Sequence, residues 1–221
     1  CPTRRSPDLC STQCRIRGDM PSRRSKFLAT YFRDNRRPGR DCLVYGLEPL
    51  LAAGRVAPRL ANLLMHNPAS QAILSRLGLV DLPHLQPARL KTGSQVSRSW
   101  LRRNRGNSRA VIVVQDSFTG SCDGVLVEKI HALLTQLGFD AKLTPVWDNG
   151  KARHVLGFRK GFGVTARLTL KKLRALAAFD IPVVSLDAAT GLMFTQEYRD
   201  IAGAQPIPTV LPLETFLRQQ I

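Results

Sequence analysis

Residues 110–116 read Ala-Val-Ile-Val-Val-Gln-Asp, and this stretch decides the fold. The four residues from Val111 to Val114 form a continuous apolar run that ends at the polar pair Gln115-Asp116. Strands buried on both faces of a parallel sheet show this pattern, whereas half-buried strands alternate between apolar and polar residues. The stretch therefore predicts a strand inside a sheet that is covered on both sides.

Toward the C-terminus, helical and strand patterns alternate. We expect strands over 139–146 and 181–186, and helices over 123–137, 163–178, 189–199 and 212–219. The helix over 123–137 is amphipathic, and its predicted inward face consists of Val127, Ile130, Leu133, Leu134 and Leu137. Alternation of this kind predicts a parallel sheet with helices packed against it.

Two aspartates end predicted strands. Asp116 follows the first strand and Asp187 follows the strand over 181–186. Sites in open parallel sheets gather at the carboxyl ends of the strands, which makes both residues candidates for direct chemistry. An aspartate in this position also caps the following helix, so a purely structural role is the alternative.

The first half of the chain has helical patterns. Residues 21–37 predict a helix that ends at Pro38-Gly39, and residues 41–82 predict two or three short helices. The predicted buried face of these short helices consists of Leu60, Leu63, Leu64, Ile73, Leu74 and Leu77. Residues 83–108 are polar, basic and turn-rich, as in a connecting or wrapping segment. The expected fold class is therefore α/β, with a helical N-terminal segment followed by a parallel-sheet α/β domain.

Positive charge is concentrated in two stretches. The 221 residues carry a net charge of +17, of which residues 1–40 contribute +8 and residues 89–109 contribute +7. Basic clusters attract nucleic acid, anionic lipid or acidic partners, so a non-catalytic basic binding module is one candidate function. No aromatic stacking platform or RNA-binding signature accompanies the basic runs, which argues against nucleic acid as the partner.

Five cysteines at irregular spacing argue against a secreted disulfide framework. No apolar run approaches the roughly 18 residues that a transmembrane helix requires. We therefore expect a cytoplasmic protein, with association at the inner face of the membrane as a variant of that prediction.

Cys10-Ser-Thr-Gln-Cys14 has the spacing of the third and fourth cysteines of a bacterial ferredoxin motif. Arg4 and Pro7 occupy the positions where the first two cysteines would stand, and neither residue ligates iron. Thiolates are the ligands that an iron–sulfur cluster requires, so Cys10 and Cys14 are the predicted metal ligands. Two unrelated thiols near a chain end are the alternative interpretation.

Residues 1–9 resemble a translated sequencing adapter rather than natural protein sequence. If the genuine polypeptide joins at about Cys10, then Cys1 is an artefact and the sequence is the C-terminal piece of a longer protein. Two further cysteine ligands would then have preceded Cys10.

Several stretches together resemble bacterial FAD-linked, iron–sulfur oxidases of the D-2-hydroxyglutarate dehydrogenase type. The resemblance covers residues 10–221, and it rests on the order and spacing of many short matches rather than on one decisive motif. The matching stretches are Cys10 to Cys14, Asp19-Met20-Pro21-Ser22, Ser25-Lys26-Phe27, Gly78 to Pro83, Val113 to Thr119, Asn149-Gly150-Lys151, His154 to Phe158, Leu186 to Ala189 and Gln196-Glu197-Tyr198.

This resemblance implies a division of the chain and a set of cofactors. Residues 10–40 would be the remnant of a ferredoxin-like segment that holds a [4Fe–4S] cluster, and 41–108 a helical and basic connecting region. Residues 109–221 would be an α/β domain related to the cysteine-rich CCG domains. The loop from Arg153 to Gly157 and the stretch from Leu186 to Ala189 lack the cysteines of that family, so this domain is assigned no metal.

The resemblance also implies partners. FAD would lie in an upstream domain of the same polypeptide, and electrons would pass through the cluster to a quinone or a carrier protein. The complete protein would be a 2-hydroxy acid dehydrogenase and a homo-oligomer, while this fragment alone would be inactive.

His154 is the one candidate for cofactor binding outside the cysteine pair, and no catalytic residue is assigned. His154 follows a glycine-containing loop and could face the cluster, a quinone or the edge of the flavin. A structural, hydrogen-bonded histidine is the alternative. Cys42 and Cys122 lack metal-ligand spacing and are expected to be packed thiols.

Overall fold

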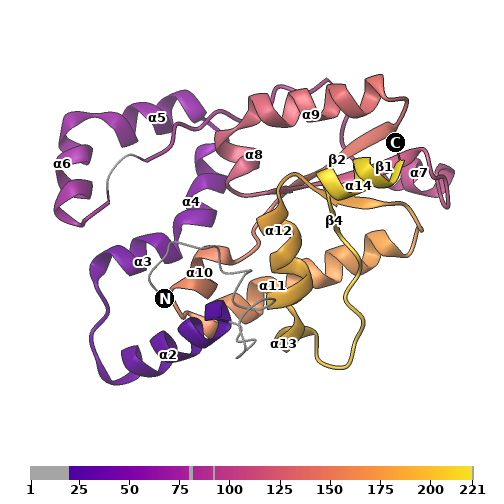
Figure 1. The fold of residues 1–221 in the computed structure, drawn as a ribbon. Helices are drawn as coiled ribbons and strands as arrows, with labels where there is room; N and C mark the ends of the chain where they lie inside the picture. The colour runs from indigo at the N-terminus through magenta and orange to yellow at the C-terminus, as the bar shows by residue number, and fades with distance from the viewer. Residues whose placement is uncertain (1–19, 80–81, 92, 221) are drawn as a thin grey trace.

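The computed structural model describes residues 20–79, 82–91 and 93–220. Its first half is helical, with the exception of a long connecting segment (Figure 1). The helices of this half are α2 (Met20–Asp34), α3 (Gly39–Tyr45), α4 (Leu47–Gly54), α5 (Pro58–His66), α6 (Pro68–Arg76) and α7 (Arg98–Arg103).

The second half alternates strands and helices, as the sequence predicts. Its strands are β1 (Ala110–Asp116), β2 (Asp140–Trp147), β3 (Val183–Ser185) and β4 (Leu211–Pro212). Its helices are α8 (Thr119–Cys122), α9 (Gly124–Gln136), α10 (Lys151–Val155), α11 (Arg159–Ala177), α12 (Ala188–Leu192), the π-helical η1 (Met193–Glu197), α13 (Arg199–Ala202) and α14 (Leu213–Gln220).

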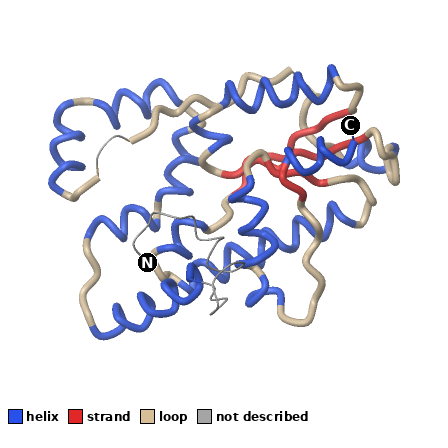
Figure 2. Tube along the Cα trace, viewed as in Figure 1, coloured by secondary structure: helices blue, strands red, loops and turns tan. Residues whose placement is uncertain are grey.

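The four strands form one parallel sheet in the order β2-β1-β3-β4, drawn in red in Figure 2. The predicted fold class, a helical segment followed by a parallel-sheet α/β domain, is confirmed. β4 and α10 were not anticipated from the sequence. Each is short, with two and five residues, so neither displays a full period of apolar residues.

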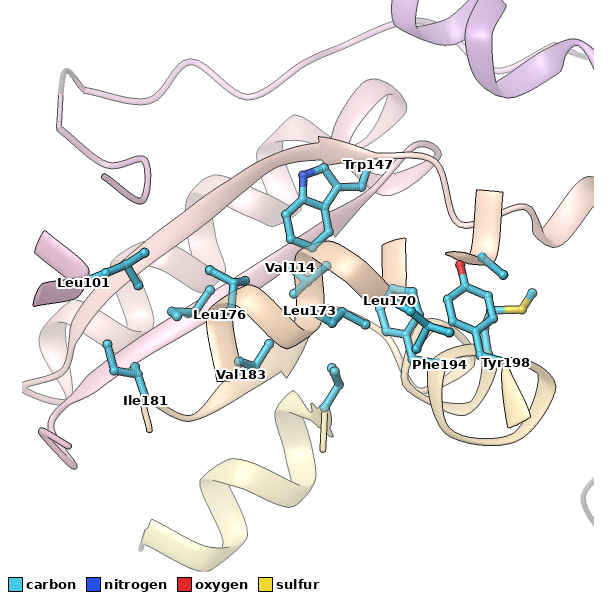
Figure 3. Close-up of a cluster of buried hydrophobic side chains, with 14 of the residues drawn as sticks. Leu101, Val114, Trp147, Leu170, Leu173, Leu176, Ile181, Val183, Phe194 and Tyr198 are labelled. Carbon is cyan, nitrogen blue, oxygen red and sulfur yellow. The ribbon is translucent and has the colours of Figure 1, made fainter. Parts of the chain in front are cut away.

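β1 is buried along its whole length because helices cover both faces of the sheet. On one face, Val114 packs with the α11 residues Leu170 and Leu173 (Figure 3). Ile112 belongs to the same buried cluster. On the other face, Val111 and Val113 join a cluster to which α9 and α14 contribute Val127, Leu134 and Phe216. The prediction from the apolar run, a strand that is covered on both faces, is thus confirmed.

Two residues of the predicted inward face of α9 are not buried. Val127, Ile130 and Leu134 lie in the core, but Leu133 and Leu137 are 41% and 38% exposed. The buried stripe of α9 is therefore narrower than its apolar pattern.

The outer edge of β2 is partly covered. Gln95 forms a parallel bridge with Leu143, in which the Leu143 carbonyl accepts from the Val96 amide at 2.9 Å and the Leu143 amide donates to the Ser94 carbonyl at 2.9 Å. Pro145 follows, close to an irregularity in the β1–β2 register, and has no amide hydrogen to offer. The predicted connecting segment 83–108 therefore serves as an edge cover as well as a link.

The helical half differs from prediction in its packing. The helix expected over 21–37 is present as α2, and the region 41–82 contains α4, α5 and α6 together with most of α3. The prediction that the leucine-rich face is buried is wrong, since Leu60, Leu63 and Ile73 are 56%, 68% and 59% exposed. Periodicity identifies an apolar stripe, but it does not identify what lies against that stripe.

α2 packs closely against the α/β domain near α10. The guanidinium of Arg37 donates to the carbonyls of Leu156 and Gly157 at 2.8 and 3.3 Å and lies 3.9 Å from the centroid of the Phe158 ring. Gly157 has a φ of +74°, and a Cβ there would lie 2.8 Å from the Ala29 amide nitrogen. This glycine therefore permits a backbone approach that another residue would block.

None of the helices in the described part of the chain combines the length and the apolar content that crossing a bilayer requires.

Candidate functional site

Polar residues gather at the carboxyl edge of the sheet, where the strands of an open α/β fold direct their following loops. β1 ends at Asp116, and β2 leads into the loop Asp148-Asn149-Gly150. Ser185 ends β3 nearby, and Asp187 follows it. The topology thus brings together the ends that the sequence marked with aspartates.

Both predicted strand-end aspartates act as caps. The Asp116 carboxylate accepts hydrogen bonds from the amides of Phe118 and Thr119 at 3.0 and 3.3 Å, which supports the turn into α8. The Asp187 carboxylate accepts from the Thr190 amide at 2.5 Å and from its hydroxyl at 3.0 Å, at the start of α12. The contacts of both aspartates are therefore those of helix and turn caps, which was the alternative to a role in direct chemistry.

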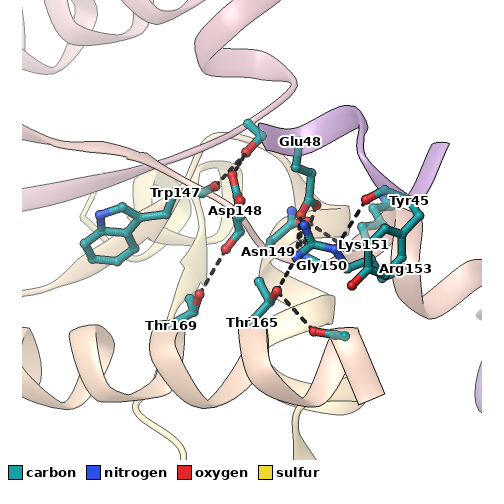
Figure 4. A network of polar contacts seen from close by, with 12 residues as sticks. Tyr45, Glu48, Trp147, Asp148, Asn149, Gly150, Lys151, Arg153, Thr165 and Thr169 are labelled. Atoms are coloured by element: carbon teal, nitrogen blue, oxygen red, sulfur yellow. Dashed lines mark hydrogen bonds and ion pairs between the residues drawn. The ribbon is translucent and has the colours of Figure 1, made fainter. Parts of the chain in front are cut away.

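Glu48 occupies the centre of this edge, and sequence reasoning missed it. Its side chain comes from α4 and is fully buried. The two carboxylate oxygens accept from the Gly150 amide at 2.9 and 3.2 Å (Figure 4). Gly150 has a φ of +76°, which is the left-handed conformation that a glycine adopts without strain. The loop after β2 thereby turns its amide toward a carboxylate from a distant helix.

Arg153 lies beside Glu48 and links four elements. Its Nη1 atom is 3.7 Å from the Glu48 Oε2 and donates to the Thr165 hydroxyl on α11. Its Nε donates to the Tyr45 carbonyl at 3.4 Å, and the guanidinium carbon lies 5.0 Å from the centroid of the Tyr45 ring. Through this residue, α10 holds α3, α4 and α11 together around the carboxylate.

Burial dominates the electrostatics of Glu48. Loss of hydration raises its pKa from 4.5 to about 7, and the nearby negative charge of Asp148 acts in the same direction. Arg153 and the hydrogen bond from Gly150 lower the pKa, but they do not offset the burial. Glu48 therefore exchanges a proton near neutral pH. Because no part of it is exposed, it suits a role in holding a proton rather than in touching a substrate.

The loop between β2 and α10 is fixed by hydroxyl groups. The Ser117 hydroxyl donates to the Asp148 carboxylate at 2.7 Å, and the Thr169 hydroxyl donates to the Asp148 carbonyl at 3.0 Å. The Tyr198 hydroxyl donates to the Asn149 carbonyl at 2.7 Å. Burial raises the pKa of Tyr198, so its hydroxyl stays protonated and keeps donating.

His154, the predicted cofactor-binding residue, lies inside the protein on α10 and is 5% exposed. Its Nδ1 is 2.7 Å from the Glu197 Oε2, although the two groups lack the alignment of a hydrogen bond. Its ring packs against Phe162 with centroids 4.6 Å apart, and a cavity of about 20 Å³ adjoins the pair. These contacts give His154 a defined structural setting, and its binding of a cofactor stays a prediction.

Cys10 and Cys14, the predicted metal ligands, lie outside the described residues. Within residues 20–79, 82–91 and 93–220, no group of three or more His, Cys, Asp or Glu side chains is placed to hold a metal ion. The described residues therefore offer no such group of further ligands to complete a metal site with Cys10 and Cys14. Cys122 is half-buried as expected, and burial raises its pKa, but the expectation of a packed Cys42 is wrong because this thiol is exposed.

One sequence signal could have indicated Glu48. It is the only acidic residue between positions 42 and 80, and it stands among leucines in Leu47-Glu48-Pro49-Leu50-Leu51. An isolated charge within an apolar helix is unusual unless it has a buried partner. Its partners, Gly150 and Arg153, are about a hundred residues away, and no local pattern connects them.

The chain is similar to curated bacterial proteins named D-2-hydroxyglutarate dehydrogenase. It is 36% identical to the protein from Pantoea ananatis over 222 residues, which is 96% of this chain and 22% of that protein. It is 35% identical to the Escherichia coli protein over 208 residues, with coverages of 89% and 20%. The Pseudomonas putida protein is 33% identical over 217 residues, with coverages of 94% and 22%.

The chain thus spans about a fifth of the length of the curated relatives it matches. No protein-family profile matches it. No solved structure matches it either.

Proposed function

The chain is a homologue of one segment of bacterial D-2-hydroxyglutarate dehydrogenases, and on that premise we propose that it is the C-terminal electron-transfer and assembly part of a flavin and iron–sulfur 2-hydroxy acid dehydrogenase. The observation that carries this proposal is the extent of the match, at 31–36% identity over 86–96% of the chain. A match of this extent is longer than a single shared motif would give.

Cofactor roles follow from this proposal. FAD, bound in an upstream domain of the same polypeptide, would accept the hydride of the 2-hydroxy acid, and a [4Fe–4S] cluster would carry single electrons onward. Cys10 and Cys14 would supply two of the cluster's thiolate ligands, and the remaining ligands would precede them. The acceptor would be a quinone or a carrier protein.

The described residues support a bracing role beside such a cluster. α2 begins six positions after Cys14, and it is held against the α/β domain by the close approach at Gly157 and by Arg37, which lies three residues after the helix ends at Asp34. The α/β domain would therefore hold α2 in one orientation. A fixed orientation favours electron transfer because it keeps the distance between redox centres constant.

Analysis of the full-length gene product tests the proposal. The protein should be purified without oxygen, and its iron, sulfide and flavin contents measured. We expect Cys10→Ala to lower iron and sulfide without lowering flavin. Cys42→Ala is the matched control, because Cys42 is an exposed thiol outside the motif. Unchanged iron and sulfide in Cys10→Ala would remove the metal assignment, and a full-length protein without flavin would remove the proposed function.

A further inference from the structure

An apolar face on α5 and α6 is left without a cover in the described part of the chain. Neither helix contains a buried residue. We call this surface the arm face and define it by Leu60, Leu63, Leu64, Ile73 and Leu77, which are 37–68% exposed. Figure 1 shows α5 and α6 at the edge of the molecule, away from the sheet.

The arm face has the residue spacing of a protein core. Leu60, Leu63 and Leu64 stand at positions i, i+3 and i+4 of α5, so they form one stripe. Single exposed leucines are ordinary on protein surfaces, but contiguous apolar patches mark interaction sites, and the three leucines of α5 are neighbours on one side of that helix.

A cavity next to the arm face extends the apolar surface. It has a volume of about 220 Å³ and lies between α3–α4 and α5–α6. Its lining includes Leu47, Leu50, Leu51, Leu64, Met65 and Leu74. The helices of this region therefore enclose space that is lined by leucines, and an apolar side chain from a partner would find matching surface there.

Charge distinguishes the arm face from the flanking stretches. Residues 41–88 hold three basic and three acidic side chains, whereas the stretches on either side carry +8 and +7. Anionic membranes and nucleic acids are recognised through Lys and Arg, which this region does not concentrate. A neutral, leucine-rich surface is instead typical of permanent interfaces, whose cores are depleted of charge.

We propose that the arm face docks against the upstream part of the same full-length polypeptide. This inference rests on the proposed function, since it takes the chain to be one segment of a larger protein. The relatives are about five times as long as the region they share with this chain, because the chain covers only 20–22% of them. In a full-length protein of the relatives' size, the four-fifths outside this region would be a large partner on the same polypeptide, so a neutral apolar face would suit permanent docking against it.

Hydrogen exchange tests this docking. We expect the amides of residues 58–76 to exchange at least tenfold more slowly in the full-length protein than in the 221-residue chain. Leu63→Glu in the full-length protein should remove this protection. Leu168→Glu is the matched control, because Leu168 is 58% exposed on α11 and lies outside the arm face. The control should leave the protection intact.

Three results would overturn the docking. The first is equal exchange in the full-length protein and in the chain. The second is protection that survives Leu63→Glu, or that Leu168→Glu removes equally. The third is a loss of protection in Leu63→Glu that is accompanied by a halving of the protein's molecular mass, as measured by light scattering. That result would make a second copy of the protein the partner that covers the arm face.

The two proposals fail separately. A full-length protein that contains flavin and iron, but leaves residues 58–76 unprotected, would refute only the docking. Protection that depends on Leu63 in a protein without flavin and iron would refute only the dehydrogenase assignment. If Leu63→Glu lowers the flavin content, the milder Leu63→Ala replaces it, and it should reduce protection in the same segment.

Discussion

At the scale of single residues, Glu48 is the most informative side chain in the described structure. It is a carboxylate without exposed surface whose pKa burial raises to about 7. Between pH 4.5 and 7 the unfolded chain releases this proton while the folded protein retains it. The free energy of unfolding therefore falls as pH rises through this window, by about 3 kcal/mol at most from this group.

Glu48→Gln should flatten this pH dependence. The amide does not ionise, so the part of the decrease between pH 4.5 and 7 that Glu48 causes should disappear. Denaturant unfolding of the 221-residue chain at several pH values measures this difference. Glu214→Gln is the control, since Glu214 is exposed on α14 and its substitution changes the formal charge by the same amount. Parallel stability curves for wild type and Glu48→Gln would contradict the assignment.

Gly157 offers a second test at this scale. Gly157→Ala combines the cost of a left-handed backbone, about 1–2 kcal/mol, with an overpacking cost of about 1–3 kcal/mol against α2. Gly106→Ala is the control, because Gly106 has a similar φ of +68° but no atom within 4 Å of its ideal Cβ position. Gly157→Ala should lower the free energy of unfolding clearly more than Gly106→Ala does. Equal losses would show that α2 does not pack closely at this position.

At the scale of elements, the attachment of α2 depends on Arg37. Arg37→Ala removes two hydrogen bonds to the carbonyls of Leu156 and Gly157 and the contact with the Phe158 ring. Hydrogen bonds from charged groups contribute about 1.5–3 kcal/mol, so the helix should detach more often. We expect the amides of residues 20–34 to exchange several-fold faster in Arg37→Ala. Arg36→Ala is the control because Arg36 is exposed, and equal exchange in both variants would argue against this anchor.

Elements with a full apolar period were predictable from the sequence, whereas the burial of their faces was not. β1 and α9 appear close to their expected bounds, because each carries its own pattern over seven or more residues. The stripe of Leu60, Leu63 and Leu64 has an equally clear pattern, yet it is exposed. The spacing of apolar residues along a helix indicates that one side is apolar. Whether that side is covered depends on how the helices pack in the tertiary structure.

The candidate site was predictable only in part, for a related reason. The strand ends pointed to Asp116 and Asp187, and both lie at the carboxyl edge of the sheet, where they cap turns. The contacts of Glu48 with Gly150 and Arg153 join residues about a hundred positions apart. No local spacing encodes such a contact, because it depends on how α4 packs against the loop after β2.

At the scale of the whole molecule, the proposed function predicts that the chain is catalytically silent alone. The 221-residue chain should not reduce an artificial electron acceptor when D-2-hydroxyglutarate is supplied, because the flavin and substrate sites would lie upstream. The full-length protein should do so in the same assay. Turnover by the chain alone would contradict the proposal that the flavin and substrate sites lie upstream. Inactivity of both proteins would argue against D-2-hydroxyglutarate, the compound in the relatives' names, as the substrate.

The sheet leaves little room for another chain to join it by extending its ladder. One margin is occupied by the bridge from Gln95 and interrupted by Pro145, and β4 at the opposite margin is only two residues long. Intermolecular strand addition, the usual first step toward fibrils, has few free backbone groups to use there. Concentrated samples that lose solubility should therefore form amorphous aggregates through their leucine-rich helices. The fluorescence of thioflavin T should not increase in such samples.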